Sequence, residues 1–206
     1  MARGRFITIE GIEGVGKSTN IAAIVKRIEE AGHNVLTTRE PGGTPFAEDI
    51  REILMNRGDE PVPEIAELLL MFAARSFNVN NVIVPALEEG TWVVCDRFTD
   101  SSRAYQGGGR GIPLETIDNM AAWVHGDTWP DLTILLDAPV NVGMARAGSR
   151  SAPDRIEQEK HEFFERVRNC YLELAAAEPQ RYAVVDTTRD LDTVKSEVLT
   201  LLERRL

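Results

Sequence analysis

The segment of residues 11–18 constrains the fold more than any other part of the chain. Its sequence, Gly-Ile-Glu-Gly-Val-Gly-Lys-Ser, fits the pattern G-x-x-x-x-G-K-[ST] between an apolar run at residues 6–9 and a helical pattern at residues 18–31. Glycines let consecutive backbone N–H groups turn inward around a phosphate, and the helix N-terminus adds partial positive charge. This strand–loop–helix context predicts a phosphate-binding loop for a nucleoside triphosphate. The alternative is a glycine-rich turn capped by Ser18.

The side chains of this loop have separable expected roles. Lys17 supplies a full positive charge to the outer phosphates, and the Ser18 hydroxyl is a ligand for Mg²⁺. A guanine-reading Asn-Lys-x-Asp and an Asp-x-x-Gly after a strand are both absent from the sequence, which disfavours a GTPase switch. The residues expected to bind the nucleotide are Gly11, Glu13, Gly14, Val15, Gly16, Lys17, Ser18 and Thr19.

Short β-branched runs alternate with longer helical patterns along the whole chain. Such alternation predicts crossover connections, and therefore an α/β fold with a five-stranded parallel sheet covered by helices on both faces. The chain has no internal repeat and no Pro/Ser-rich linker, so residues 1–206 are expected to form one domain. The strands are expected at residues 6–9, 35–37, 92–95, 132–136 and 182–185. The first three helices are expected at residues 18–31, 46–56 and 64–84, and the third should be interrupted at Pro85. A further helix is expected after a glycine-rich loop that follows the third strand, and the last helix begins near Asp190.

The composition excludes several classes of partner. Lys and Arg total 23 against 33 Asp and Glu, a net charge of −10, which argues against nucleic acid or an anionic membrane as the main partner. Cys95 and Cys170 are too few for a disulfide framework and lack metal-ligand spacing. No uninterrupted apolar stretch approaches the ~18–20 residues of a membrane helix, and the N-terminus leaves no room for a signal peptide. A reducing cytoplasmic location is therefore expected.

Three polar clusters follow predicted strands and point to an acceptor site. Asp96-Arg97-Phe98 comes after the third strand, where Asp96 can hold Mg²⁺ and Arg97 can project between donor and acceptor phosphates. The alternative is a weak Asp–Arg surface pair. Thr-Arg-Glu-Pro-Gly-Gly-Thr occupies residues 38–44, after the second strand, and Tyr-Gln-Gly-Gly-Gly-Arg occupies residues 105–110, where three glycines allow close backbone approach or mobility.

Together these strings resemble the bacterial thymidylate kinase family. The resemblance includes Asp-Arg-Ile-Glu-Gln-Glu at residues 154–159 and covers essentially the whole chain in the expected order. Glu-Pro-Gly-Gly-Thr and Tyr-Gln-Gly-Gly-Gly-Arg are far more specific than the phosphate loop, which many families share. The resemblance implies a P-loop nucleoside monophosphate kinase-like fold. It also implies a cytoplasmic homodimer that transfers the γ-phosphate of ATP to dTMP with Mg²⁺, giving dTDP and ADP.

The resemblance also assigns residues to the phosphate and sugar of dTMP. Glu13 would approach the deoxyribose 3′-OH, and Arg97 would bind the dTMP phosphate with Arg51 nearby. Tyr105 would pack where a ribose 2′-OH would protrude, which favours deoxyribose.

For the base, Arg75 would read the thymine edge with help from Ser102 and Gln106. The aromatic residue that stacks on thymine usually lies four residues before the thymine-reading Arg. That position is Met71 here, and Phe72 is three residues before Arg75. Both spacings place a side chain on the Arg75 face of a helix. We expect Met71 and Phe72 to line the thymine pocket jointly; which one covers the base is open, and a core position for either is the alternative.

A polar segment with Gly, Ser and Pro, residues 146–156, is expected to form a mobile lid. In the subclass whose phosphate loop lacks an Arg, the lid carries the catalytic arginines, and Gly14 occupies the place of that Arg here. Gly148 stands where some relatives have another Arg. The candidates are therefore Arg146, Arg150 and Arg155, with Arg150 the first choice because it lies mid-segment and Arg146 expected at the adenine. A solvated basic loop is the alternative.

The chemistry expected of such a site is electrostatic. A phosphate monoester has its second pKa near ~6, so the acceptor oxygen is already anionic and no general base is assigned. Catalysis is expected from positive charge and positioning by Lys17, Arg97, Arg150, Arg155 and Mg²⁺. Two alternatives stay open: a kinase for another nucleoside monophosphate, and a P-loop regulatory ATPase that transfers phosphate to no nucleotide.

Overall fold

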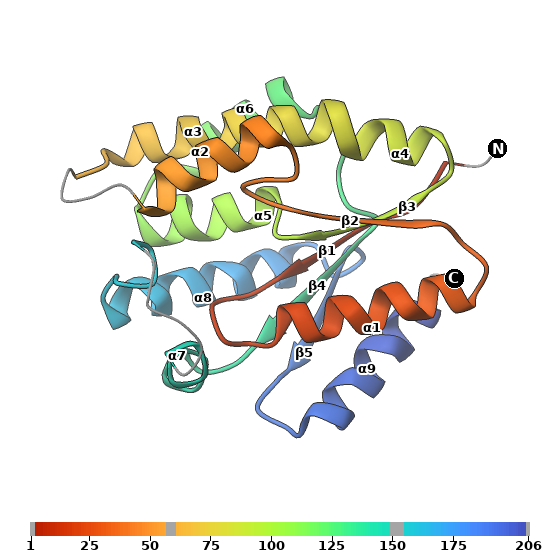
Figure 1. Cartoon of the computed structure of the whole chain (residues 1–206). Helices are drawn as coiled ribbons and strands as arrows, with labels where there is room; N and C mark the ends of the chain where they lie inside the picture. The colour runs from red at the N-terminus through yellow and green to blue at the C-terminus, as the bar shows by residue number, and fades with distance from the viewer. Residues whose placement is uncertain (1–2, 57–60, 149–154, 205–206) are drawn as a thin grey trace.

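The computed structural model describes residues 3–56, 61–148 and 155–204, and its centre is a five-stranded parallel sheet (Figure 1). The strand order is β2-β3-β1-β4-β5, and all four neighbouring pairs are parallel. The predicted α/β architecture is confirmed. The strands are β1 (Phe6–Glu10), β2 (Val35–Arg39), β3 (Trp92–Asp96), β4 (Leu132–Asp137) and β5 (Tyr182–Asp186).

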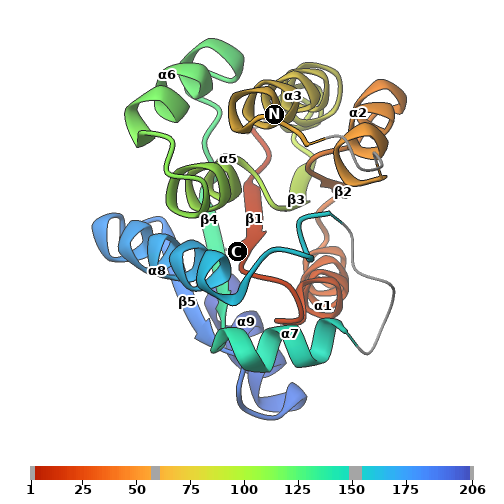
Figure 2. The same ribbon diagram turned by 90° about the vertical axis from the view of Figure 1, so that its left-hand side faces the viewer.

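Helices cover both faces of this sheet (Figure 2). One face carries α1 (Lys17–Glu30) and α9 (Leu191–Glu203). Asp190 caps the N-terminus of α9, where its side chain accepts a hydrogen bond from the Thr193 backbone N–H. The other face carries α4 (Val84–Glu88), α5 (Thr99–Ser102) and α8 (His161–Ala177). The remaining α-helices are α2 (Pro45–Asn56), α3 (Glu64–Asn78), α6 (Leu114–Val124) and α7 (Val140–Ala147).

The alternation of side chains along β1 decides what each face contains. Ile7 and Ile9 belong to the core cluster that includes Ile24 and Ile28 of α1. Phe6 belongs to the opposite cluster, where its ring meets that of Phe98 edge to face at 5.0 Å. Each such buried side chain contributes about 1.5–3 kcal/mol to folding. Because successive side chains of a strand point to opposite faces, Glu10 lies on the Phe6 face.

The segment from Glu64 to Glu88 is one helical stretch with an interruption before its proline. Residues Val79–Ile83 are π-helical, and α4 follows with Pro85 near its start, so Pro85 changes the helix without ending it. By length and composition alone, the helical stretch Glu64–Glu88 could span a membrane. The sequence did not predict this, because it has no uninterrupted apolar stretch of that length. A buried core helix passes the same test, and Phe72, Val79 and Ile83 are buried here.

Residues Arg103–Gly109, expected as a glycine-rich loop, instead form a π-helical continuation of α5. The glycines are needed because α8 packs against this segment. A Cβ on Gly108 would lie 2.6 Å from the Cβ of Cys170, and one on Gly109 would lie 2.4 Å from a ring carbon of Phe163. The glycines therefore provide the close backbone approach, which seats α8 beside the end of β1.

Candidate active site

The phosphate loop connects the end of β1 to the start of α1. The Lys17 Nζ donates hydrogen bonds to the carbonyl oxygens of Gly11 (3.0 Å) and Ile12 (2.9 Å), which fold the side chain back over the loop. Burial, together with the positive charge of Arg97, lowers the pKa of Lys17 to about 8. Ser18 and Thr19 are exposed in the first turn of α1. An anion here meets the half-buried cation of Lys17 and the N-terminus of a 14-residue helix.

Gly14 packs the loop directly against α7. Its φ is +75°, and a Cβ there would lie 1.9 Å from the carbonyl oxygen of Gly143. A Cβ on Gly143 would in turn lie 2.6 Å from the carbonyl oxygen of Glu13. An Arg at position 14 therefore does not fit unless α7 moves, so Lys17 is the cation that this loop provides.

A cavity of about 340 Å³ opens beside the loop at the carboxyl ends of β1, β2 and β3. The structure brings together most of the residues that the sequence predicted for the acceptor. The predicted residues on its wall are Glu13, Gly14, Lys17, Arg51, Met71, Arg75, Asp96, Arg97, Ser102, Tyr105 and Gln106. The other wall residues are Glu40, Pro41, Met55, Phe98, Ser101, Ala147, Ile156 and Glu157.

Arg97 lies at the phosphate-loop end of this cavity in a left-handed backbone conformation, with φ 68°. Its Nη2 donates to Glu13 Oε1 at 2.8 Å, and its Nη1 lies 3.3 Å from Ser101 Oγ and 3.4 Å from the Tyr171 hydroxyl. The Tyr105 ring lies 4.8 Å from the guanidinium, and the Tyr105 hydroxyl reaches both Glu13 oxygens at 2.8 and 2.9 Å. A non-glycine residue with positive φ is strained, so this held guanidinium is a feature that points to function.

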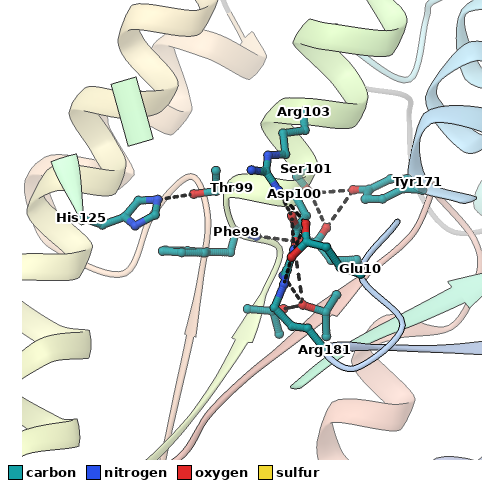
Figure 3. Close-up of polar contacts among 12 residues, drawn as sticks. Glu10, Phe98, Thr99, Asp100, Ser101, Arg103, His125, Tyr171 and Arg181 are labelled. Carbon is teal, nitrogen blue, oxygen red and sulfur yellow. Dashed lines mark hydrogen bonds and ion pairs between the residues drawn. The ribbon is translucent and has the colours of Figure 1, made fainter. Parts of the chain in front are cut away.

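Glu10, the last residue of β1, holds the backbone and side chains next to Arg97 (Figure 3). Its carboxylate accepts hydrogen bonds from the Phe98 backbone N–H (2.7 Å), the Ser101 hydroxyl (2.6 Å) and the Tyr171 hydroxyl (2.8 Å). Burial, reinforced by the nearby negative charge of Asp100, raises the pKa of Glu10 to about 7. No sequence motif indicated Glu10 or Tyr171, although a carboxylate directly before a phosphate loop is a usable signal.

Asp100 and His125 are two further buried polar residues in this region (Figure 3). Asp100 forms a buried ion pair with Arg181 at 2.5 Å, which attaches α5 to the start of β5. His125 Nε2 lies 2.8 Å from Thr99 Oγ1. Burial, together with the positive charge of Arg75, lowers the pKa of His125 to about 3, so this histidine is neutral and structural at neutral pH.

Arg75 of α3 lies at the other end of the cavity. Its Nε donates to the buried carboxylate of Glu40 at 2.7 Å, and its Nη2 donates to Ser102 Oγ at 3.0 Å. Its Nη1 is buried and, among the residues that the structure describes, has no hydrogen-bond partner. A buried donor without an acceptor costs about 1–3 kcal/mol, so this N–H group is suited to a ligand oxygen. Glu40 belongs to the Glu-Pro-Gly-Gly-Thr string, but its role in holding Arg75 was not predicted.

Met71 and Phe72 have different positions, although both were expected at the thymine pocket. Met71 lines the cavity. Phe72 is 1% exposed, lies in the core cluster with Leu68 and Ile117, and is not on the cavity wall. Its ring supports the Arg75 guanidinium at 4.5 Å. Phe72 therefore contacts the cavity only indirectly, through its packing against Arg75.

The lid arginines fall partly outside the described residues, since Arg150 lies in 149–154. Arg146 Nη1 donates to the carbonyl oxygen of Thr187 at 2.9 Å, after β5. Arg155 donates from Nη2 to the buried Glu67 at 2.6 Å and from Nε to the Leu54 carbonyl oxygen at 2.8 Å. In this structure Arg155 therefore lies against α2 and α3 and not on the cavity wall.

The residues expected to hold Mg²⁺, Ser18 and Asp96, fit a site in which phosphate and water supply most of the metal ligands. Asp96 Oδ1 is buried and has no hydrogen-bond partner in the described part of the chain. The described residues contain no group of three His, Cys, Asp or Glu side chains around one point. Mg²⁺ takes most of its ligands from water and phosphate and needs only one or two protein oxygens, so Asp96 and the Ser18 hydroxyl suffice.

A phosphate loop on the first strand of a parallel sheet, facing an arginine-lined cavity, defines a P-loop nucleoside monophosphate kinase. The family model for thymidylate kinase matches residues 9–198. The chain is 52% identical to the thymidylate kinase of Methylobacillus flagellatus, over 97% of each chain. It is 54% identical to that of Methylococcus capsulatus, over 100% of this chain and 98% of the other. The crystal structure of thymidylate kinase from Ehrlichia chaffeensis superposes with a TM-score of 0.79 at 32% identity, covering 98% of this chain and 99% of that one. This chain belongs to the thymidylate kinase family.

Proposed function

We propose that this protein transfers the γ-phosphate of ATP to dTMP and so produces dTDP and ADP. The observation that carries the proposal is the arrangement of cations around one cavity, with Lys17 and Arg97 at one end and Arg75 at the other. The first two suit phosphates, and Arg75 Nη1, which has no hydrogen-bond partner among the described residues, suits a carbonyl oxygen of the base. The family relationship supports the same substrate pair.

The reaction moves one phosphoryl group. An anionic oxygen of the dTMP phosphate attacks the γ-phosphorus, the bond to the bridging oxygen of ADP breaks, and that oxygen leaves with the electron pair. Because the acceptor is already ionised, no side chain needs to remove a proton. Arg97 holds the acceptor phosphate with Arg51 beside it, and Lys17 holds the donor phosphates. Bound Mg²⁺, on Ser18 and Asp96, would neutralise donor phosphate charge.

Glu13 and Tyr105 form the sugar end of the acceptor site in this proposal. The Tyr105 hydroxyl and Arg97 both donate to the Glu13 carboxylate, which holds that carboxylate in the cavity. A carboxylate so placed can accept from the deoxyribose 3′-OH. The rigid Tyr105 ring would lie where a 2′-OH would need space, and so would disfavour ribose.

The lid, residues 146–156, is proposed to supply the further positive charge at the transferring phosphoryl group. The packing of Gly14 on Gly143 supports this, since the loop has no space for its own Arg. Arg150 is the proposed catalytic arginine, Arg155 assists it, and Arg146 contacts adenine. Arg155 would have to leave Glu67 to reach the phosphates, which places it second to Arg150.

The assembly is proposed to be a homodimer of one kinase domain, residues 1–206, in the cytoplasm. Exposed apolar side chains on α2, α3 and α6 support a second copy as partner, and Trp123 of α6 is 88% exposed. Exposed apolar side chains in such number are typical of an interface between subunits. The exposed apolar residues on these helices are Phe46, Ile53, Ile65, Leu69, Phe77, Leu114 and Trp123.

A coupled assay of ADP release, run with dTMP, dUMP, dCMP, AMP and GMP and without an acceptor, tests the proposal. The highest kcat/KM is expected with dTMP, and little ADP without an acceptor. A higher kcat/KM with another monophosphate would identify a different nucleotide kinase. An ADP release that no acceptor changes would identify an ATPase.

A further inference from the structure

Glu67 of α3 is a buried carboxylate behind the cavity, and the mechanism above gives it no role. Its side chain is 2% exposed. Gln106 Nε2 donates to its Oε1 at 2.9 Å, and Arg155 and Arg110 donate to its Oε2 at 2.6 and 3.2 Å. Glu67 is not on the cavity wall, whereas Gln106 is. Of these three partners of Glu67, Gln106 is the one that lines the cavity.

Glu67 is ionised at neutral pH. Burial alone would raise the pKa of this carboxyl, but the hydrogen bond from Gln106 and the charge of Arg110 outweigh burial and hold the pKa below its ordinary value. An ionised carboxylate accepts hydrogen bonds and donates none. The Gln106 side chain must therefore turn its NH₂ group toward Glu67, and its carbonyl oxygen lies on the opposite side of the amide.

The base end of the cavity then contains one fixed donor and one fixed acceptor. The donor is Arg75 Nη1, which is buried and has no partner in the described part of the chain. The acceptor is the Gln106 carbonyl oxygen. The two side chains are close because Arg75 Nη2 donates to Ser102, which lies one helical turn before Gln106.

We propose that Glu67 is a positioning residue that orients the Gln106 amide and so selects bases with N3–H beside a carbonyl oxygen. Thymine and uracil present O4 as acceptor and N3–H as donor, which matches Arg75 and Gln106. Cytosine presents an amino group and an unprotonated N3, which mismatches both. The inference rests on the proposed function, because it takes Arg75 and Gln106 as the residues that face the base.

The decisive variant is Glu67→Gln, because a carboxamide at position 67 can donate or accept and leaves Gln106 free to turn over. Three quantities are measured for the wild-type protein and the variant. They are the inhibition constant of dCMP against dTMP, kcat/KM for dTMP and kcat/KM for dUMP. We expect the preference for dTMP over dCMP to fall about tenfold or more, as expected when a mismatched polar pair is relieved. The ratio of dUMP to dTMP and the KM for ATP should stay unchanged, since uracil and thymine share the same edge.

Glu159→Gln is the matched control. Glu159 also pairs with Arg110, at 2.5 Å, but is not a partner of Gln106, so its loss removes a carboxylate and an ion pair without freeing the amide. Gln106→Met removes the acceptor itself and should lower the preference for dTMP over dCMP. In that background, Glu67→Gln should change the ratio no further.

Three results would overturn the proposal. One is an unchanged ratio of dCMP to dTMP in Glu67→Gln. Another is a change of the ratio of dCMP to dTMP in Glu159→Gln that equals the change in Glu67→Gln. The third is a change of the ratio of dUMP to dTMP in Glu67→Gln that equals the change of the ratio of dCMP to dTMP. Ratios from one preparation do not depend on the folded fraction. If Glu67→Gln does not fold, an unchanged ratio of dCMP to dTMP in Gln106→Met would overturn the proposal. Failure of the wild-type protein to phosphorylate dTMP would instead refute the proposed function.

Discussion

The guanidinium of Arg97 and the carboxylate of Glu13 form an ion pair of 2.8 Å inside the cavity. Arg97 follows β3 and Glu13 belongs to the phosphate loop after β1, so the pair joins the two strand ends at the centre of the sheet. The pair keeps Arg97 oriented, and the acceptor phosphate can bind its remaining N–H groups. Because Glu13 belongs to the phosphate loop, the proposed function implies that this one contact would link the donor and acceptor sites.

Lys17→Ala should nearly abolish transfer while the protein remains folded. Lys17 contacts loop carbonyl oxygens and the cavity, so its loss removes charge from the donor phosphates and little packing. We expect kcat to fall roughly 10²–10³-fold, as for other lost electrostatic contacts. Lys26→Ala is the control, because Lys26 lies exposed on the same helix in an ion pair with Glu30. An unchanged kcat, or unfolding of Lys17→Ala, would contradict this prediction.

Tyr105→Ala should improve activity on the ribose analogue of dTMP relative to dTMP itself. The ring is 4% exposed and stacks beside Arg97, so only its removal opens space for a 2′-OH. Tyr105→Phe keeps the ring and should keep the selectivity, although it loses the hydrogen bonds to Glu13. The kcat/KM ratio of the two substrates is the measurement. A fixed ratio in Tyr105→Ala would exclude this residue as the discriminator.

Met71→Ala and Phe72→Ala should both raise the KM for dTMP with little change in the KM for ATP, but for different reasons. Met71 lines the cavity and packs, partly buried, against two core clusters, so its loss should lower the free energy of unfolding less than the loss of Phe72 does. Phe72 is buried beneath Arg75, and its loss should also lower the free energy of unfolding by about 3–5 kcal/mol. Steady-state kinetics and chemical unfolding on the same samples measure both. Equal rises in the KM for ATP would indicate a general packing defect.

Arg150→Ala should lower kcat strongly and leave dTMP affinity nearly intact. The acceptor phosphate is assigned to Arg97, whereas a lid arginine would act on the charge that develops during transfer, an effect worth ~10³ or more in related chemistry. Single-turnover rates and equilibrium dTMP binding test this. Arg189→Ala is a control, since Arg189 is an exposed arginine after β5. A normal transfer rate, or an affinity lost in proportion to the rate, would show that Arg150 is an ordinary loop residue.

The stability of the unliganded protein should fall as the pH rises from about 4.5 through 7, owing to Glu10. The unfolded chain loses this proton near its ordinary value of 4.5, whereas burial keeps it bound in the folded state to about 7. The folded state then binds more protons in this window, so raising the pH favours unfolding, by at most about 3 kcal/mol. Glu10→Gln should lack this part of the pH dependence. Parallel curves of unfolding free energy against pH for both proteins would contradict the assignment.

Local sequence patterns predicted the parts of this protein that depend on neighbours in the chain. The strand-loop-helix context of residues 11–18 indicated the phosphate loop, and β-branched runs indicated the five strands. The strings after β2 and β3 supplied seven residues of the cavity wall, Glu40, Pro41, Asp96, Arg97, Phe98, Tyr105 and Gln106. These succeeded because a glycine-rich loop, a β-branched run and the carboxyl edge of a parallel sheet all depend on a few consecutive residues.

The tertiary structure alone decided which side chains act on one another across the chain. Glu67 and Gln106 are 39 residues apart, and Glu10 and Tyr171 are 161 apart, yet both pairs form buried hydrogen bonds. Met71 and Phe72 have the same helical pattern, but only the packing of α3 placed one at the cavity and the other in the core. Contacts of this kind depend on how helices and strands pack, and that packing minimises buried unpaired charge and empty volume over the whole molecule, which no local pattern records.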